Sequence, residues 1–120
     1  MNHLKVKKIV INIFKNFKLK EAHAEISAEY LIKAELLGAP SHGLSRLKMY
    51  CERLNKKIIN PNPKIKIKKI SQSISHIDAN NSIGFVAANL GIKIAIKNAK
   101  KTGIGLVAIK NSGHYGLSSF

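Results

Sequence analysis

Residues 83–109 read IGFVAANLGIKIAIKNAKKTGIGLVAI, and this segment decides the fold. Up to about residue 101 its apolar side chains recur at helical spacing, which predicts a long helix closed by Gly103 as a C-terminal cap. Residues 104–109 form a continuous apolar run bounded by turn residues, typical of a strand buried on both faces. A helix followed by such a strand predicts an α/β domain. Because a buried strand needs neighbours on both sides, the sheet is expected to be incomplete.

The sequence before residue 60 predicts a helical segment. Apolar periodicity predicts helices at about residues 4–18, 20–37 and 42–55, with Gly38 ending the second and Ser41 as a plausible N-cap of the third. The sequence Asn-Pro-Asn-Pro at 60–63 is the clearest break. Strands are expected at about 64–67, half exposed by their alternation, and at 74–79, followed by a loop at 80–82. We therefore expect a helical segment over residues 1–60 and the start of an α/β domain over 61–120.

Composition narrows the class of protein. With 45% hydrophobic residues the chain is expected to fold, and it has no apolar run long enough to cross a membrane and no signal peptide pattern. One cysteine, Cys51, forms no internal disulfide, so a reducing cytoplasm is the expected location. The formal charge of +15 invites nucleic-acid binding, but the lysines are scattered and tryptophan is absent, so a nucleic-acid partner is not expected.

The predicted helix over 42–55 carries a polar face. His42, Arg46 and Tyr50 are spaced by four, and Arg53 points the same way, whereas the leucines of this segment cluster on another face. These are the two arginines of the chain, and a guanidinium holds a carboxylate at two points, which lysine does not. The face is therefore a candidate carboxylate-binding site; an ordinary solvated helix face is the alternative.

Two histidines are candidates for acid–base chemistry. His42 is expected in the first turn of a helix, where the helix dipole and Arg46 would lower its pKa; a neutral imidazole paired with the Ser41 hydroxyl could polarise or protonate a carbonyl. His114 follows the predicted buried strand between Gly113 and Gly116, where open α/β sheets bind ligands. The alternatives are a capping serine beside an exposed histidine, and a glycine-rich surface turn.

Two other patterns carry no site. The sequence Gly-Ile-Gly-Leu-Val-Ala at 103–108 matches the Gly-x-Gly-x-x-Ala dinucleotide pattern. It follows a helix and enters a strand, whereas the dinucleotide loop follows a strand and opens a helix. The five histidines and one cysteine lack the spacing of zinc ligands, so no metal site is expected.

Three blocks of the chain resemble one enzyme family. The first is GAPSHG at 38–43 with Arg46, Tyr50 and Leu54 and the INP at 59–61; the second is IDANN at 77–81 with Gly84; the third runs from GIGLVA at 103–108 to NSGHYG at 111–116. Together they resemble the malate/L-lactate dehydrogenase family, which includes ureidoglycolate, sulfolactate and piperideine-carboxylate oxidoreductases. The resemblance covers most of residues 20–120. It implies an α/β (α+β) fold in which the N-terminal helical segment leads into an incomplete mixed-sheet, non-Rossmann nucleotide-binding domain.

The resemblance also implies an activity and a site. The expected reaction is hydride transfer between NAD or NADP and a 2-hydroxy or 2-oxo acid such as malate or lactate. Catalytic roles fall on His114, His42 and Ser41; Arg46 would clamp the substrate carboxylate with Tyr50 as a supporting contact; His114, Tyr115 and Gly116 would lie beside the cofactor. Family members are longer chains that work as homodimers, so this chain is expected to be a fragment, inactive alone. A non-catalytic remnant and, less favoured, a small basic nucleic-acid-binding protein are the alternatives.

The resemblance does not decide which histidine is the principal acid–base group. The residues themselves predict that only His42 is held neutral, by a helix terminus and by Arg46. His114 would then have the higher pKa and would donate the proton, while His42 and Ser41 orient the carbonyl.

Overall fold

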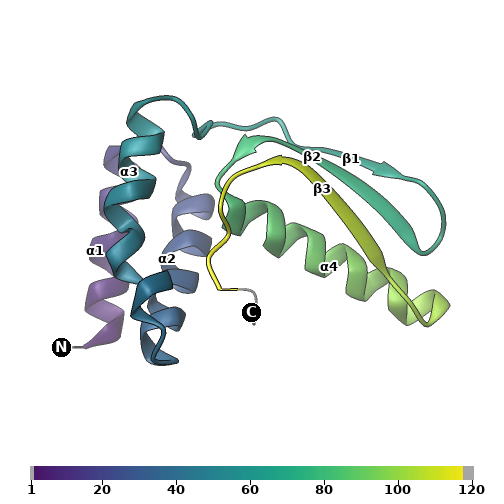
Figure 1. The fold of residues 1–120 in the computed structure, drawn as a ribbon, viewed down its shortest axis with the longest axis horizontal. Coiled ribbons are helices and arrows are strands. Elements are labelled where there is room, and N and C mark those ends of the chain that lie inside the picture. The colour runs from purple at the N-terminus through teal and green to yellow at the C-terminus, as the bar shows by residue number, and fades with distance from the viewer. Residues whose placement is uncertain (1, 118–120) are drawn as a thin grey trace.

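A computed structural model describes residues 2–117 as a helical part followed by a helix packed on a small sheet (Figure 1). The elements in chain order are α1 (His3–Asn16), α2 (Glu21–Leu36), the 3-10 turns η1 (Pro40–His42) and η2 (Leu44–Arg46), α3 (Leu47–Asn55), β1 (Lys66–Lys69), β2 (Ile74–Ser82), α4 (Gly84–Thr102) and β3 (Leu106–Ser112). None of the helices in this described range is long and apolar enough to cross a membrane.

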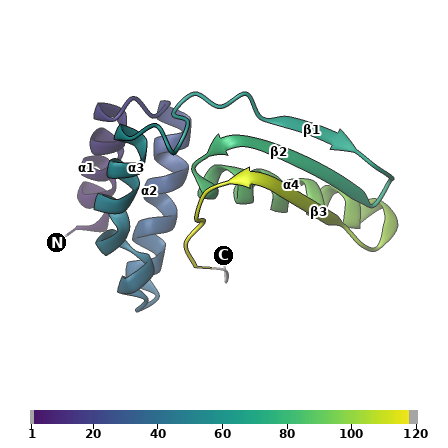
Figure 2. The same cartoon turned by 45° about the horizontal axis from the view of Figure 1, so that its top comes forward.

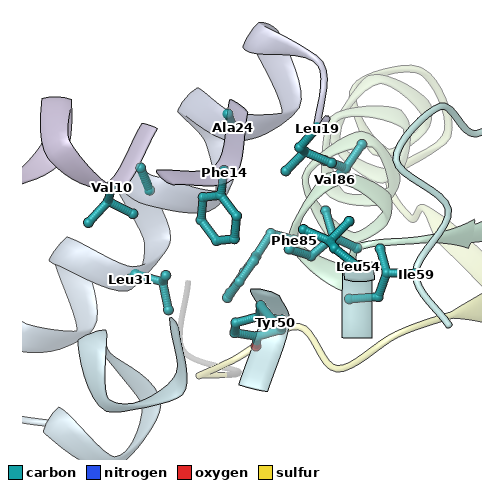
Figure 3. Close-up of a cluster of buried hydrophobic side chains, with 12 residues drawn as sticks. Val10, Phe14, Leu19, Ala24, Leu31, Tyr50, Leu54, Ile59, Phe85 and Val86 are labelled. Atoms are coloured by element: carbon teal, nitrogen blue, oxygen red, sulfur yellow. The ribbon is translucent and has the colours of Figure 1, made fainter. Parts of the chain in front are cut away.

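The two parts share one hydrophobic core. Helices α1, α2 and α3 stand side by side, and the first turn of α4 packs against them (Figures 1 and 2). Figure 3 shows Phe14, Tyr50 and Phe85 in this cluster, each no more than 1% exposed. Phe85 lies within 5.2 Å of the Tyr50 ring and stacks on Tyr30 at 5.8 Å, measured between ring centroids. Truncating such a buried ring costs about 3–5 kcal/mol, so Phe85 is a main link between the sheet part and the helical part.

The sheet is mixed, as expected. Its strand order is β1-β2-β3, with β1 antiparallel to β2 and β2 parallel to β3. A parallel pair needs a crossover, and α4 supplies it by covering one face of the sheet. Ile77 and Ala79 of β2 and Ala87 of α4 form the small core between these layers. The structure thus confirms a helical segment leading into an α/β arrangement with a mixed sheet.

The prediction that residues 104–109 form a strand buried on both faces is wrong for this chain. The strand is β3, and its burial is slight: Leu106 is 53% and Ile109 36% exposed. The reason is that α4 covers only one face and no further strand pairs with β3 among residues 2–117. The apolar composition of β3 is therefore not matched by burial within the described residues.

Two local predictions are also wrong. The third α-helix begins at Leu47, not at residue 42, because Gly43 adopts φ −97° and ψ −136° and divides the preceding residues into two 3-10 turns. Residues 80–82 belong to β2 and are not a loop. Asn80 and Asn81, at φ 50° and 56°, carry the strand through left-handed positions that asparagine tolerates.

These asparagines mark an irregularity shared by β2 and β3. The register between the strands shifts between Asp78 and Ser82, and Asn111 in β3 is also left-handed at φ 52°. The Asp78 carboxylate contacts both strands at this point. Its Oδ1 accepts the Asn80 backbone N–H of β2 at 3.1 Å and the Asn111 side-chain N–H of β3 at 3.0 Å. The pairing resumes after this irregularity at Ser82 and Ser112, and residues 113–116 leave the sheet directly after that pair.

We expect the isolated chain to self-associate through β3. Replacing the exposed Leu106 with lysine should reduce this association, because a charge on an edge strand opposes strand addition. Sedimentation at several concentrations measures the effect. Leu37→Lys is the matched control, since Leu37 is 59% exposed but lies at the end of α2. A sharp thermal transition from a monomeric wild-type sample would contradict this expectation.

The Asp78 contacts predict an acid-sensitive bulge. The Asn111 side chain, then the Asn80 backbone N–H and Lys110, lower the pKa of the Asp78 carboxyl. A carboxyl with a lowered folded-state pKa stabilises the fold above its unfolded pKa, and this stability is lost as pH falls through the folded pKa. Below about pH 4 the melting temperature of the wild type should therefore fall more steeply than that of Asp78→Asn. Equal slopes for the two proteins would show that the bulge does not depend on the carboxylate.

Candidate active site

The segment between α2 and α3 is a closed pair of turns. Ser45 Oγ donates to the Pro40 carbonyl at 2.6 Å, and Arg46 Nε donates to the Ser41 carbonyl at 2.7 Å. The backbone adds bonds from His42 N–H to the Ala39 carbonyl and from Arg46 N–H to the Gly43 carbonyl, both at 3.0 Å. Throughout, we call residues 40–46 the SHG loop. These bonds within the loop fix His42 and Arg46 relative to each other.

Ser41 and His42 are paired as expected, but not by helix capping. The Ser41 Oγ lies 3.0 Å from His42 Nδ1, and the Ser41 side chain caps no helix. His42 belongs to a three-residue 3-10 turn, so it is not in the first turn of α3. The helix-dipole argument made for His42 therefore does not hold, whereas the predicted pairing of Ser41 with His42 does.

Tyr50 differs from its predicted place on an open polar face. It is fully buried in α3 against Phe85, because η2 turns the chain before α3 begins and the helix presents Tyr50 inward (Figure 3). Burial raises its pKa to about 12, with Arg53 and Arg46 acting in the opposite direction. The phenol is thus neutral at physiological pH and available as a hydrogen-bond donor.

The Tyr50 hydroxyl contacts His114, which lies 64 residues away in sequence, at 2.7 Å from Nδ1. The same nitrogen accepts the Gly116 backbone N–H at 3.2 Å. An N–H donor requires an unprotonated acceptor, so Nδ1 carries no proton in this arrangement and the phenol donates to it. The neutral ring therefore has its proton on Nε2, and among residues 2–117 no hydrogen bond uses that atom.

The sequence predicted that nothing around His114 would lower its pKa, and this prediction is wrong. Burial lowers its pKa, and the charges of Arg46, His42 and Arg53 lower it further. The site is built this way because residues 113–116 leave β3 and return to the helical part, as the path towards the C-terminal end shows in Figure 1. His114, just beyond the end of β3, thus lies close enough to Arg46 of the SHG loop and Arg53 of α3 to be affected by their charges.

The structure brings His42, His114 and Gly116 together but leaves Tyr115 apart from the two histidines. The rings of His42 and His114 lie 6.3 Å apart between centroids at an interplanar angle of 22°. Gly116, at φ 81°, reaches His114 through its N–H and packs on Phe85, which leaves no space for a side chain there. Tyr115 is 51% exposed, and within residues 2–117 no hydrogen bond joins it to His42 or His114. It lines a mainly apolar groove of about 460 Å³ between α4 and β3 that also reaches Gly113.

Two residues that shape the site, Glu35 and Gly84, were not predicted as site residues from the sequence. Glu35, near the end of α2, accepts the Leu44 backbone N–H within the SHG loop. Gly84, the first residue of α4, lets the backbone carbonyls of Gly113 and His114 pass so close that a Cβ would overlap them. For Gly84 the signal was a glycine at a helix start. For Glu35 the signal was an acidic residue in the last helical turn, where the helix dipole disfavours it.

Known proteins share both the sequence and this fold. L-sulfolactate dehydrogenase of Methanocaldococcus jannaschii is 38% identical over 114 residues, which are 95% of this chain and 33% of that protein. Ureidoglycolate dehydrogenase (NAD(+)) of Escherichia coli K12 is 36% identical over 102 residues, covering 85% of this chain and 29% of that one. The structure of malate dehydrogenase from Pyrococcus horikoshii superposes with a TM-score of 0.94 at 34% identity, covering 98% of this chain and 34% of that one.

The chain therefore spans about a third of the length of the relatives it matches. The family model for malate/L-lactate dehydrogenase matches residues 1–120. With the serine–histidine pair, the Tyr50–His114 contact and the shared fold in place, the chain belongs to the malate/L-lactate dehydrogenase family.

Proposed function

We propose that the complete protein transfers a hydride between a nicotinamide cofactor and a 2-hydroxy or 2-oxo acid, and that this chain supplies its acid–base and carboxylate-binding residues. The observation that carries the proposal is the hydrogen bond between the buried Tyr50 and His114, under the charges of Arg46 and Arg53. Relatives named for malate, sulfolactate and ureidoglycolate support the substrate class. The homodimer and the cytoplasmic location stay predictions.

The described residues fit the nicotinamide end of such a cofactor. The groove between α4 and β3 is mainly apolar and reaches Gly113 and Tyr115, beside His114, and this suits a flat ring. The Gly-x-Gly-x-x-Ala pattern joins a helix to a strand and so offers no phosphate loop in the described part of the chain. When bound, the nicotinamide would accept or supply the hydride; His114, Tyr115 and Gly116 are the residues proposed to lie beside it.

His114 is proposed to move the proton. Its Nδ1 stays bonded to Tyr50 in either tautomer, because the phenol donates when Nδ1 is bare and accepts when Nδ1 carries a proton. Accepting the substrate proton at Nε2 requires the tautomer that carries its proton on Nδ1. In that tautomer the Tyr50 hydroxyl accepts from Nδ1, and the Gly116 N–H gives up its contact with that atom. The lowered pKa keeps His114 neutral near pH 7, which favours proton acceptance during oxidation of the hydroxy acid. His42, paired with Ser41, would orient the same oxygen.

Arg46 is proposed to bind the substrate carboxylate. Its Nε is engaged with the Ser41 carbonyl, which fixes the guanidinium plane and leaves its terminal nitrogens for a planar acid. The cost of Arg46→Lys follows from this geometry, since lysine keeps the charge and loses both the anchor and the two-point contact.

The test needs a complete enzyme. We define the completed chain as residues 1–120 of this protein joined to the remaining two thirds of the M. jannaschii relative, assayed with malate and sulfolactate as substrates. Nicotinamide-dependent oxidation of either acid is the expected result. A folded completed chain without this activity would contradict the proposed function.

In the completed chain, Arg46→Lys should lower kcat/KM for the acid by roughly 10- to 100-fold, since a charge-assisted contact is worth about 1.5–3 kcal/mol. Arg53→Lys is the control, because it keeps the charge near His114 and removes no proposed carboxylate contact. Steady-state kinetics that change by less than about twofold for Arg46→Lys would overturn the clamp assignment.

The pH profile separates the two histidines. His114→Ala should remove the acid limb of the oxidation profile and lower the rate about 100- to 10,000-fold, because it removes the proton acceptor. His42→Ala should lower the rate and leave the limb in place, and His3→Ala, on the exposed start of α1, should change neither. If His42→Ala removes the limb and His114→Ala leaves it, the roles are exchanged.

A further inference from the structure

Glu35 occupies a position that helix stability does not explain. It lies in the last turn of α2, where the negative end of the helix dipole disfavours a carboxylate. The chain holds only six acidic residues, and Glu21, Glu29, Glu52 and Asp78 form ion pairs with lysines. The chain thus places one of its few acidic residues where the dipole of its own helix disfavours a negative charge.

The carboxylate of Glu35 instead contacts the backbone of the SHG loop. Its Oε1 accepts the Leu44 N–H at 2.6 Å in a half-buried setting, a short bond of the charge-assisted kind. Leu44 begins the turn that ends in Arg46.

Gly43 makes this contact possible. The residue is buried, and a Cβ at Gly43 would overlap the carboxylate and the adjoining methylene of Glu35. The missing side chain therefore lets the loop backbone settle on the carboxylate. A glycine whose missing side chain makes room for one particular carboxylate indicates a specific packing contact and not general flexibility. We call this contact of the Gly43–Leu44 backbone with Glu35 the seat.

Gly43 and Leu44 lie between the two residues proposed to face the substrate. His42 is the last residue of the turn before this pair, and Arg46 is the last residue of the turn after it. Holding the pair against Glu35 therefore fixes the positions of both residues. The bonds within the loop set the two side chains relative to each other. The Glu35 contact ties the loop backbone to α2, beside the packing of the Leu44 side chain on the core.

We propose that Glu35 is a positioning residue for the active site: its carboxylate seats the SHG loop on α2, so that His42 and Arg46 are presented together to the carbonyl and carboxylate of a 2-oxo acid. The consequence for the reaction rests on the proposed function, whereas the seat itself does not.

The seat is tested by NMR in the 120-residue chain carrying Leu106→Lys, the substitution expected to reduce self-association through β3. With Glu35 unchanged in this background, the Leu44 amide proton should resonate well downfield and exchange slowly with solvent. Glu35→Ala should abolish both features, and Glu35→Asp should weaken them, because its side chain is one methylene shorter. Glu25→Gln is the control, since Glu25 is exposed on the same helix and the variant loses the same charge. A Leu44 amide unchanged in Glu35→Ala would overturn the seat.

The consequence is tested in the completed chain. Glu35→Ala should raise KM for the oxo acid about tenfold or more and lower kcat, with KM for the nicotinamide cofactor within about twofold of the control. Glu35→Gln, which keeps an accepting oxygen, should recover part of the loss. A merely structural role would lower the active fraction and the melting temperature and leave both KM values unchanged, and this result would overturn the proposal.

The two proposals fail in different ways. A wild-type completed chain that folds but oxidises no hydroxy acid contradicts the proposed function and leaves the NMR result on Glu35 valid. An active completed chain in which Glu35→Ala matches Glu25→Gln contradicts the positioning role alone. If the completed chain does not fold, the Leu44 amide in the 120-residue chain decides whether the seat exists.

Discussion

The hydrogen bond between Tyr50 and His114 is the contact on which the arrangement of the site depends. It joins a helix of the N-terminal part to the residue that follows the last strand, and it does so from within the shared core. Because Tyr50 is buried against Phe85, its hydroxyl has little freedom to point elsewhere. A buried hydroxyl also needs a partner, so the histidine satisfies the tyrosine as much as the tyrosine orients the histidine.

The two arginines near this contact affect the pKa of both of its partners in the same direction. Arg46 and Arg53 lower the pKa of both Tyr50 and His114, so they favour the charged phenolate and oppose the charged imidazole. Burial wins at Tyr50, whose pKa rises, and it adds to the arginines at His114, whose pKa falls. The result is a neutral donor beside a neutral acceptor within a cationic setting, which is suited to an anionic substrate.

The sequence predicted elements well where a single periodicity governed them. Local pattern predicts the glycine caps at Gly38 and Gly103 and the strand after the long helix. It also predicts the helices over 3–16, 21–36 and 84–102. It failed where distant residues decide the outcome. The SHG loop is not α-helical because Gly43 leaves the helical backbone angles, at a point where it packs on Glu35, eight residues earlier. Tyr50 turns inward because Phe85 is there to cover it. The exposure of β3 likewise depends on neighbouring strands and not on its own composition.

The separation along the chain between Tyr50 and His114 bears on the order of folding. Contacts between α1 and α2 are local, so this hairpin can form early and quickly, whereas closing a loop of 64 residues carries a larger entropic cost. Phe85 covers Tyr50, so we expect α4 to dock on the helices before His114 meets the hydroxyl. During synthesis, all residues of the helical core leave the ribosome before His114. We therefore expect the contact between Tyr50 and His114 to form on a core that is already packed.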